Sequence, residues 1–414
     1  MTKVITYGTY DLLHYGHIKL LERAKALGDY LIVGVTSDDY DKVRGKINNQ
    51  QSLVERIDAV KATGLADEII VEEYDGQKID DIRKYGVDIF TLGSDWEGKF
   101  DYLNEYCKVV YLPRTEGVSS SDIRAEKLQM RIGIVSDTKS SPKFIEESRF
   151  VNGVSAEYCD RDCSGYDAVY IVTDLQRRYE DVKRAIVNGK QILCEVPLAM
   201  DAGQCRELLT LAKEKGVALV PSIKTAYLTA FSRMVLLAKS GKIGDIISVD
   251  ATCTSIRDKG YSFFTWGPIA LLPILTLLGP NYRQKKIVTR FMDSDQKVDA
   301  FTKIDFVYDH AVASLKVARA AKSEGELIIT GSKGYIYVPA PWWKTDYFEL
   351  RFENSAENRR YYYQLEGEGI RYEIAAFASQ VANGYNAGAV SDEVLIAISE
   401  MIEAFAKGED MIEI

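Results

Sequence analysis

Short apolar runs alternate with amphipathic stretches over the first part of the chain. The stretches between the runs have the spacing of apolar residues that is typical of helices, most clearly at 18–24. Alternation of strands and helices predicts a parallel sheet with helices on both faces. A charged helical stretch over about 120–129 ends this pattern. The apolar runs that predict buried strands are residues 4–7, 30–35, 68–71, 87–92 and 108–112.

The alternation restarts near residue 130 and then gives way to longer β-rich runs from about residue 246. The longer runs, joined by turns such as 331–334, predict a largely antiparallel sheet, and a helix is expected over 392–406. The expected strands are 131–135, 168–172, 191–195 and 217–221, followed by 246–255, 300–308, 311–318, 325–338 and 347–352.

We therefore expect an α/β protein with three domains. Residues 1–128 form an N-terminal Rossmann-like domain and residues 129–248 a second one. Residues 249–414 form a C-terminal α+β domain with a large, mostly antiparallel sheet.

Composition indicates which kinds of partner the chain can bind and in which cellular compartment we expect it. The net charge of −9 argues against broad nucleic-acid binding, although it permits binding of a single nucleotide. The start of the chain lacks a signal-peptide pattern, and the apolar run 269–278 is too short to span a membrane. Of the six cysteines, Cys159 and Cys163 are close, but no second pair completes a zinc site. We expect free, mostly buried thiols in a cytoplasmic protein.

Two of the three histidines of the chain, His14 and His17, lie between a predicted strand and a predicted helix. A helix N-terminus offers free N–H groups and a positive dipole end, which suit phosphate. Gly16 removes a side chain, so a nucleotide can lie against the backbone. The pattern His-x-Gly-His at this position favours nucleotidyl transfer.

Two other interpretations of the histidines exist. Both imidazoles could cap or pack the helix, or they could bind zinc, since a spacing of three or four residues can place two histidines on one helix face. We find no neighbouring residues that complete a set of zinc ligands, so we predict no protein-bound metal here. The pair, the glycine and the strand–turn–helix context favour function over capping.

Further polar residues follow the predicted strands and converge on the same sheet edge, where ligands of such sheets bind. Arg44 and Lys46 lie in a polar stretch, 38–52, that we expect to be a loop, while Arg56 lies on the next helix and Lys78 begins a later one. Residues 114–121 run from strand through loop to helix, with a glycine and serines suited to bind phosphate. Each cation alone is typical of a solvated surface, but their grouping favours a shared anionic ligand.

The first 127 or so residues resemble bacterial glycerol-3-phosphate cytidylyltransferases of the HxGH nucleotidyltransferase superfamily. The stretches that carry the resemblance are 8–25, 93–101 and 111–123. Arg44 stands where the family has a lysine, and Ser120 and Ser121 replace threonines. The resemblance implies catalytic roles for His14, His17, Lys46 and Arg114, further nucleotide contacts from Thr9, Tyr10, Asp95, Thr115, Gly117, Ser119, Ser120 and Ser121, and substrate contacts from Arg44, Arg56 and Lys78.

The resemblance also implies the reaction. The phosphate of glycerol 3-phosphate would attack the α-phosphorus of CTP in line, and pyrophosphate would leave, with Mg²⁺ neutralising its charge. An ionised phosphate needs no general base, so catalysis is mostly positioning and charge stabilisation. The expected product, CDP-glycerol, implies a role in teichoic acid, capsule or related glycopolymer synthesis. A tRNA synthetase interpretation of His-x-Gly-His is the weakest, because the chain is acidic.

Residues 130–414 resemble the glucose-fructose oxidoreductase/inositol dehydrogenase family, through 131–135, 185–199 and 325–339. The family has a catalytic lysine in Glu-Lys-Pro, where this chain has Val196, and a glycine-rich turn where 136–141 contain no glycine. The catalytic His and Asp of the family would fall near Ile269 and Thr265. We therefore predict a degenerate oxidoreductase that uses no NAD(P).

Three hypotheses for the whole chain remain open at this point. The first is a cytidylyltransferase, acting on glycerol 3-phosphate or on another phosphorylated small molecule, with a non-catalytic rear half. The second is a bifunctional enzyme whose rear half oxidises or reduces a polyol or sugar phosphate. The third gives the rear half a scaffold or regulatory role. We expect CTP and a phosphorylated polyol as ligands, no nucleic acid, no membrane insertion, and a homodimer or homotetramer formed through an apolar face of the C-terminal sheet.

For three other residues the expectations are simpler. His310 lies in a turn between strands and is given no role. Trp342 and Trp343 are expected in a packed loop rather than in an exposed partner site.

Overall fold

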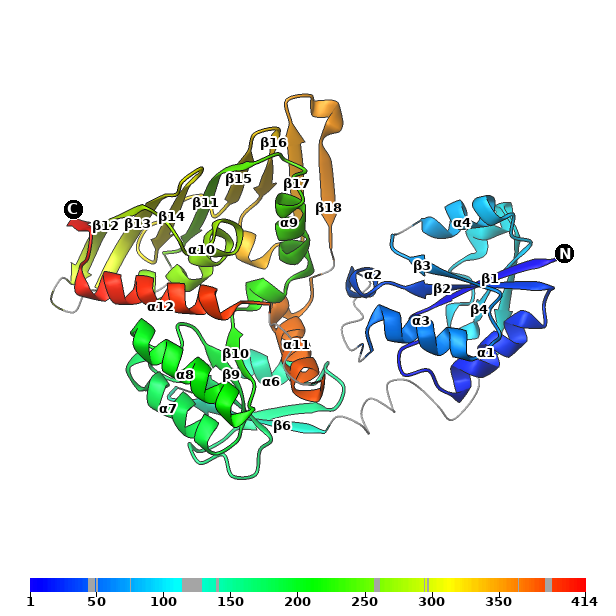
Figure 1. Cartoon of the computed structure of the whole chain (residues 1–414), viewed down its shortest axis with the longest axis horizontal. Coiled ribbons are helices and arrows are strands. Elements are labelled where there is room, and N and C mark those ends of the chain that lie inside the picture. Colours follow the sequence, from blue (N-terminus) through cyan, green and yellow to red (C-terminus); the bar gives the residue numbers. More distant parts are fainter. Residues whose placement is uncertain are drawn as a thin grey trace. The chain divides into compact units, whose positions relative to one another are not determined.

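The computed structural model describes residues 1–43, 49, 51–74, 76–113, 129–138, 141–256, 261–293, 295, 298–363, 365–383 and 389–414. The chain divides into two compact units, Met1–Gln129 and Met130–Ile414, which we describe separately (Figure 1). The parts predicted as 129–248 and 249–414 thus lie together in the second unit. In the described ranges no helix is both long and apolar enough to cross a membrane.

The first unit is built on a parallel sheet with the strand order β3-β2-β1-β4-β5. Every strand predicted from the sequence is present; the apolar runs of the three inner strands are buried, and those of the edge strands β3 and β5 are partly buried. The strands are β1 Lys3–Gly8, β2 Tyr30–Thr36, β3 Glu68–Glu72, β4 Ile89–Gly93 and β5 Lys108–Leu112. The helices are α1 Tyr15–Lys25, α2 Asp38–Val43, α3 Leu53–Ala62 and α4 Gln77–Tyr85, with short 3-10 helices at Ser94–Trp96 and Asp101–Glu105.

Successive residues of β1 pack into two separate hydrophobic cores, because side chains alternate between the two faces of a strand. Val4 packs on one face with Leu21 of α1 and Val60 of α3. Ile5 packs on the other face with Ile82 of α4 and with Phe90 of β4. The sheet is therefore covered on both faces, as predicted.

One prediction for this unit is wrong. The stretch 38–52 was expected to be a loop, but it begins with helix α2. Asp38, Asp39 and Asp41 lie in the first turn of α2, where the positive end of the helix dipole favours acidic side chains. Residues 44–48, 50 and 114–128, and with them almost all of the predicted helix 120–129, lie outside the described residues.

The second unit begins with another parallel sheet, of order β10-β9-β8-β6-β7. Strand β7, Val154–Tyr158, was not predicted, because it lies at the sheet edge and only partly buries its side chains. The other strands are β6 Met130–Ser136, β8 Ala168–Val172, β9 Gln191–Glu195 and β10 Leu219–Ser222. The helices are α6 Pro142–Ser148, α7 Leu175–Val187, α8 Ala202–Lys215 and α9 Thr229–Lys239, with a 3-10 helix at Lys224–Tyr227.

The rest of the second unit is the predicted, mostly antiparallel sheet, of order β18-β17-β16-β15-β11-β14-β13-β12-β19. Among the described strands of this sheet, only the pairs β11–β14 and β12–β19 are parallel. The strands are β11 Ile246–Thr254, β12 Gln284–Asp293, β13 Val298–Val307, β14 Val312–Ala318, β15 Leu327–Gly331, β16 Gly334–Val338, β17 Tyr347–Phe352, β18 Arg359–Tyr362 and β19 Met411–Glu413. The helices are α10 Phe263–Leu278, α11 Ile370–Asn383 and α12 Asp392–Lys407, with 3-10 helices at Trp342–Lys344, Ser355–Glu357 and Gly367–Gly369.

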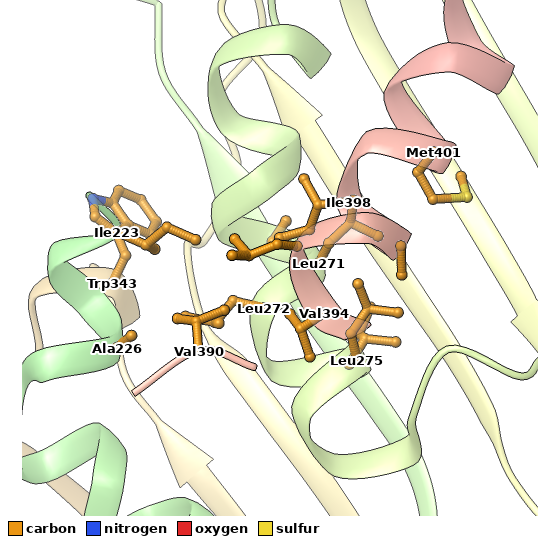
Figure 2. Close-up of a cluster of buried hydrophobic side chains, with 14 of the residues drawn as sticks. Ile223, Ala226, Leu271, Leu272, Leu275, Trp343, Val390, Val394, Ile398 and Met401 are labelled. Carbon is orange, nitrogen blue, oxygen red and sulfur yellow. The ribbon is translucent and has the colours of Figure 1, made fainter. Parts of the chain in front are cut away.

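A continuous core joins this sheet to the second parallel sheet. Figure 2 shows Leu271, Leu272 and Leu275 of α10 beside Val394 and Ile398 of α12. Helix α12 also packs against α8 of the parallel sheet. The two parts therefore share one core and form a single unit.

The outward residues of the large sheet do not form the expected apolar face. Lys303 bonds to Asp305 on this face at 2.9 Å, and Ser248 bonds to Asp250 at 2.6 Å. Toward β18 the same face carries a cluster of tyrosine and arginine side chains, which stack and form cation–π pairs. The residues of this tyrosine–arginine cluster are Tyr335, Tyr337, Tyr347, Tyr362, Arg351 and Arg360, with Glu349 accepting from both arginines.

The structure contradicts the prediction for one pair of cysteines and confirms the prediction for the two adjacent tryptophans. Cys159 and Cys163 form a disulfide, so the expectation of free thiols is wrong for this pair. The other described cysteines are free thiols. Trp342 and Trp343 are buried, which confirms the packed loop.

Candidate active site

His14 caps helix α1 and at the same time faces His17. The Nδ1 atom of His14 accepts a hydrogen bond from the N–H of Gly16 at 3.1 Å. The two imidazole rings stack, with centroids 3.9 Å apart and planes inclined by 23°. Because Nδ1 is the acceptor, a neutral His14 carries its proton on Nε2, where it can donate to a ligand. Capping and function are therefore compatible at this residue.

The turn before His14 has an unusual backbone conformation. Tyr10 and Leu12 have positive φ angles of 53° and 48°, which non-glycine residues rarely adopt. The ring of Tyr10 is buried against His17 and leaves no space for a side chain on Gly8. The structure thus places the predicted nucleotide-binding residue Tyr10 in the core, under the histidines.

Arg56 holds the backbone of this turn. Its side chain is 0% exposed, and its guanidinium donates to the backbone oxygens of Thr9 at 2.7 Å, of Thr36 at 2.8 Å and of Gln51 at 3.2 Å. It also bonds to the carboxylate of Asp38. These contacts join the ends of β1 and β2 to α2 and α3, and they favour a positioning role for Arg56 over the predicted contact with substrate.

A second carboxylate, Asp41, extends the same network. It is fully buried, lies 3.7 Å from Arg56 and accepts from the hydroxyl of Thr9 at 2.9 Å. Asp11 accepts from the N–H of Gln51 at 2.9 Å. Sequence reasoning gave neither carboxylate a role. Asp11 lies within the motif, three residues before His14, whereas nothing in the sequence distinguishes Asp41 from the acidic residues beside it.

Lys78 begins α4, as predicted, but is largely buried. Its ammonium pairs with Glu72 and lies over the rings of Tyr7 at 4.8 Å and Phe100 at 5.4 Å. The hydroxyl of Tyr7 donates to Asp81 at 2.9 Å, and burial with this carboxylate raises the pKa of Tyr7. Lys78 is therefore a cation held in a partly aromatic, acidic pocket.

The remaining predicted residues divide into two groups. Asp95 is exposed in the 3-10 helix after β4, the strand that pairs with β1, so it follows the same edge of the sheet as the histidines. Others lie outside the described residues: Arg44, Lys46, Arg114, Thr115, Gly117, Ser119, Ser120 and Ser121. Across the described ranges, no group of three His, Cys, Asp or Glu side chains could hold a metal ion.

In the second unit, the positions where the resembled oxidoreductases carry catalytic residues meet in space. Val196, Thr265 and Ile269 line one cavity of about 270 Å³ at the carboxyl ends of β8, β9 and β10. Glu373 of α11 and Lys224 also line it. Sequence reasoning missed these two residues, because no motif marks them and α11 was not predicted.

Asp137 links the segments that follow β6 and β8 in this sheet. A carboxylate oxygen of Asp137, after β6, accepts from the N–H of Asp174, after β8, at 2.9 Å. The other oxygen lies 2.6 Å from Arg161 and 3.8 Å from Arg177. Dinucleotides bind at such a switch point with pyrophosphate against a free helix N-terminus. Here Asp137 accepts from the N-cap residue of α7 and pairs with two arginines.

Comparisons with known proteins divide the chain at the same place. Residues 5–126 match the cytidylyltransferase-like family, and residues 122–222 match the oxidoreductase family with an NAD-binding Rossmann fold. The glycerol-3-phosphate cytidylyltransferase of Bacillus spizizenii is 52% identical over 126 residues, which are 30% of this chain and 97% of that protein. The enzyme of the same name from Staphylococcus aureus is 48% identical, over 95% of its length.

The second unit is similar in fold to solved oxidoreductases. A structure of KijD10, a 3-ketoreductase from Actinomadura kijaniata, in complex with TDP-benzene and NADP, covers 69% of this chain and 99% of its own, with a TM-score of 0.59. At 18% sequence identity this similarity supports the fold alone.

Proposed function

Because the chain belongs, through the 126 residues that it shares with these relatives, to the glycerol-3-phosphate cytidylyltransferase family, we propose that it makes CDP-glycerol and pyrophosphate from CTP and glycerol 3-phosphate. The observation that carries the proposal is the stacked pair His14–His17 at the N-terminus of α1, in a domain that is 52% identical to a named enzyme over nearly its whole length.

In the proposed mechanism, the phosphate of the acceptor attacks the α-phosphorus of CTP opposite the leaving pyrophosphate. The Nε2–H of His14, the imidazole of His17 and the N-terminal end of α1 would stabilise the negative charge that develops on the phosphates. Arg56 fixes the turn that presents these donors. When Mg²⁺ is bound with CTP, it neutralises charge on pyrophosphate.

We assign the remaining predicted residues on the resemblance. Lys46, Arg114, Thr115, Gly117, Ser119, Ser120 and Ser121 would contact the triphosphate, with Asp95 and Thr9 near the nucleotide. Lys78 would hold the acceptor phosphate, with Arg44 beside it. Glu72 then holds the Lys78 side chain in place until the phosphate binds.

The second unit supports a second candidate function. Its match to the NAD-binding Rossmann model favours oxidation or reduction of a polyol or sugar phosphate. Against this stand Val196 in place of the family lysine and the absence of glycine from residues 136–141. We therefore propose a non-catalytic rear unit in a cytoplasmic homo-oligomer that serves glycopolymer synthesis. Titration of the full chain with NADH and NADPH separates the two: micromolar binding with hydride transfer would establish the bifunctional enzyme.

The experiment for the first unit is release of pyrophosphate by the full chain. CTP is compared with ATP, and glycerol 3-phosphate with ribitol 5-phosphate and ethanolamine phosphate. We expect turnover with CTP and glycerol 3-phosphate to exceed every other combination. Equal turnover with ATP, or much faster turnover of another acceptor, would contradict the substrate assignment.

A further inference from the structure

The stretch of chain that carries Lys46 begins and ends beside the turn before His14. Its two described flanks, Asp41 of α2 and Asn49, bond directly, because the side-chain amide of Asn49 donates to the carboxylate of Asp41 at 2.9 Å. Asp41 is fully buried and also accepts from the hydroxyl of Thr9, the residue that follows β1, at 2.9 Å. Both flanks of the stretch are therefore bonded, directly or through one carboxylate, to the end of β1.

Gln51 makes a second connection to the same turn. Its side-chain oxygen accepts from the N–H of Leu12 at 2.7 Å, and its own N–H donates to the carboxylate of Asp11 at 2.9 Å. Its backbone oxygen accepts from Nε of Arg56 at 3.2 Å. One residue thus uses three polar groups to join the turn before His14 to the start of α3.

The turn depends on such contacts because its backbone is unfavourable by itself. Tyr10 and Leu12 both have φ angles in the left-handed region, where a side chain is disfavoured. A conformation of this kind persists only where the surrounding contacts hold it. Asp11 and Leu12 stand three and two positions before His14, so Gln51 holds the backbone from which that imidazole projects.

The two sets of groups that would act on the triphosphate lie on different segments of chain. His14 follows β1, whereas Lys46, to which the resemblance gives a phosphate contact, lies between Asn49 and α2 in the sequence. Both must meet the same triphosphate, and a misplacement of about 1 Å far from the reacting atoms can cost about a hundredfold in rate. The bonds of Asn49 and Gln51 are therefore placed to set one segment relative to the other.

We propose that Gln51 and Asn49 are positioning residues for cytidylyl transfer, which set the place of Lys46 relative to His14. Neither residue lies in the stretches that carry the resemblance to the family, so the resemblance assigns them no role. The inference rests on the proposed function, and within it on the phosphate contact of Lys46.

The test uses Gln51→Met and Asn49→Leu, which keep the approximate shape of each side chain and remove its hydrogen-bonding groups. Calorimetry measures nucleotide affinity, and pyrophosphate release measures kcat/KM, with the nucleotide and acceptor that the wild type turns over fastest. We expect each substitution to weaken both by about tenfold, as loss of one hydrogen bond predicts. The matched control is Lys61→Met, which places the same side chain at an exposed position of α3 and should leave both unchanged.

A double-mutant cycle with Lys46→Ala separates positioning from a merely structural role. If Gln51 acts by placing Lys46, Gln51→Met should change nucleotide affinity less than about threefold once the lysine side chain is gone. A structural role in the fold would give the same loss in both backgrounds. Affinity is compared as well as turnover, so the cycle stays measurable where Lys46→Ala is slow, and thermal unfolding identifies any variant that does not fold.

The outcomes distinguish this inference from the proposed function. Faster turnover of another nucleotide or acceptor would contradict the substrate assignment and leave the comparison of variants intact. Wild-type affinity and turnover in Gln51→Met and Asn49→Leu would overturn the inference, and so would an equal loss with and without Lys46. A chain that neither binds CTP nor releases pyrophosphate would overturn both.

Discussion

His14 has a structural role and a proposed catalytic role, which a suitable substitution can separate. Its Nδ1 caps α1, and its Nε2 is the atom that we propose donates to a phosphate oxygen. Asparagine is also a good N-cap residue, so His14→Asn should keep the helix start while it removes the imidazole. We expect His14→Asn, His14→Ala and His17→Ala each to lower cytidylyl transfer by about a hundred- to thousandfold. The measurement is pyrophosphate release, with thermal unfolding as the control; near-normal release by His14→Asn would rule out the catalytic role of Nε2.

Glu373 makes a pH-dependent contribution to stability. Burial and Glu195 raise its pKa from 4.5 to about 8 in the folded chain, against the opposing effects of Ser222 and Lys224. Between these values the folded state keeps a proton that the unfolded state releases. Stability from this group is therefore present below about pH 4.5 and is lost as the pH rises towards 8.

We expect Glu373→Gln to remove this loss, so that its free energy of unfolding falls less than that of the wild type between these two pH values. Urea titrations at several pH values measure the difference. Glu180→Gln, at an exposed position, is the matched control. Parallel pH profiles for the wild type and Glu373→Gln would show that the carboxyl group is not protonated in the fold.

At the scale of elements, the turn before His14 depends on the contact that Arg56 of α3 makes with α2. Helix α3 begins with a capping box in which Ser52 and Glu55 bond each other's backbone N–H groups, and this places Arg56 one turn into the helix. From there the guanidinium reaches Asp38 of α2 and the oxygen of Thr9. The side chain of Arg56 therefore holds the turn before His14 in place.

Arg56→Met should therefore destabilise the first unit by about 3–5 kcal/mol, because it leaves Asp38 and Asp41 without their buried counter-charge. Arg56→Lys should keep the charge but lose several of the bonds, and we expect it to raise the KM for CTP. Urea unfolding and steady-state kinetics measure the two effects. Lys61→Met, on the exposed side of the same helix, should change stability by less than about 0.5 kcal/mol. An Arg56→Met variant as stable as Lys61→Met would refute this role.

At the scale of the whole molecule, the outer face of the large sheet is the candidate surface for self-association. Its tyrosine–arginine cluster has the composition of protein interfaces, which are enriched in Tyr and Arg. We expect the full chain to be a dimer or tetramer in light scattering after size exclusion. Tyr362→Glu, at an exposed position of the cluster, should shift it towards the monomer, whereas Tyr74→Glu, exposed in the first unit, should not. A wild-type monomer at micromolar concentration would leave this face without a partner.

The sequence by itself predicted all five strands of the first sheet, most strands of the second unit and the place of the histidine pair between a strand and a helix. Apolar runs such as 30–35 and 168–172 report burial directly, and His-x-Gly-His before a helix marks a phosphate site from local spacing alone. The resemblance to the oxidoreductase family, and not local spacing, singled out Val196 and the turn without glycine in the rear half. The edge strands β7 and β19, and also β12, whose sequence mixes charged and apolar residues, were not predicted.

Only the tertiary structure decided which polar residues meet. Arg56 and Lys78 were predicted as substrate contacts, but the fold buries them against Asp38, Asp41 and Glu72. Glu373 lies 178 positions from Glu195 along the chain, yet packing of α11 against the parallel sheet brings both into the lining of one cavity. Such long-range pairings depend on how helices pack on sheets, and residue spacing carries no information about them.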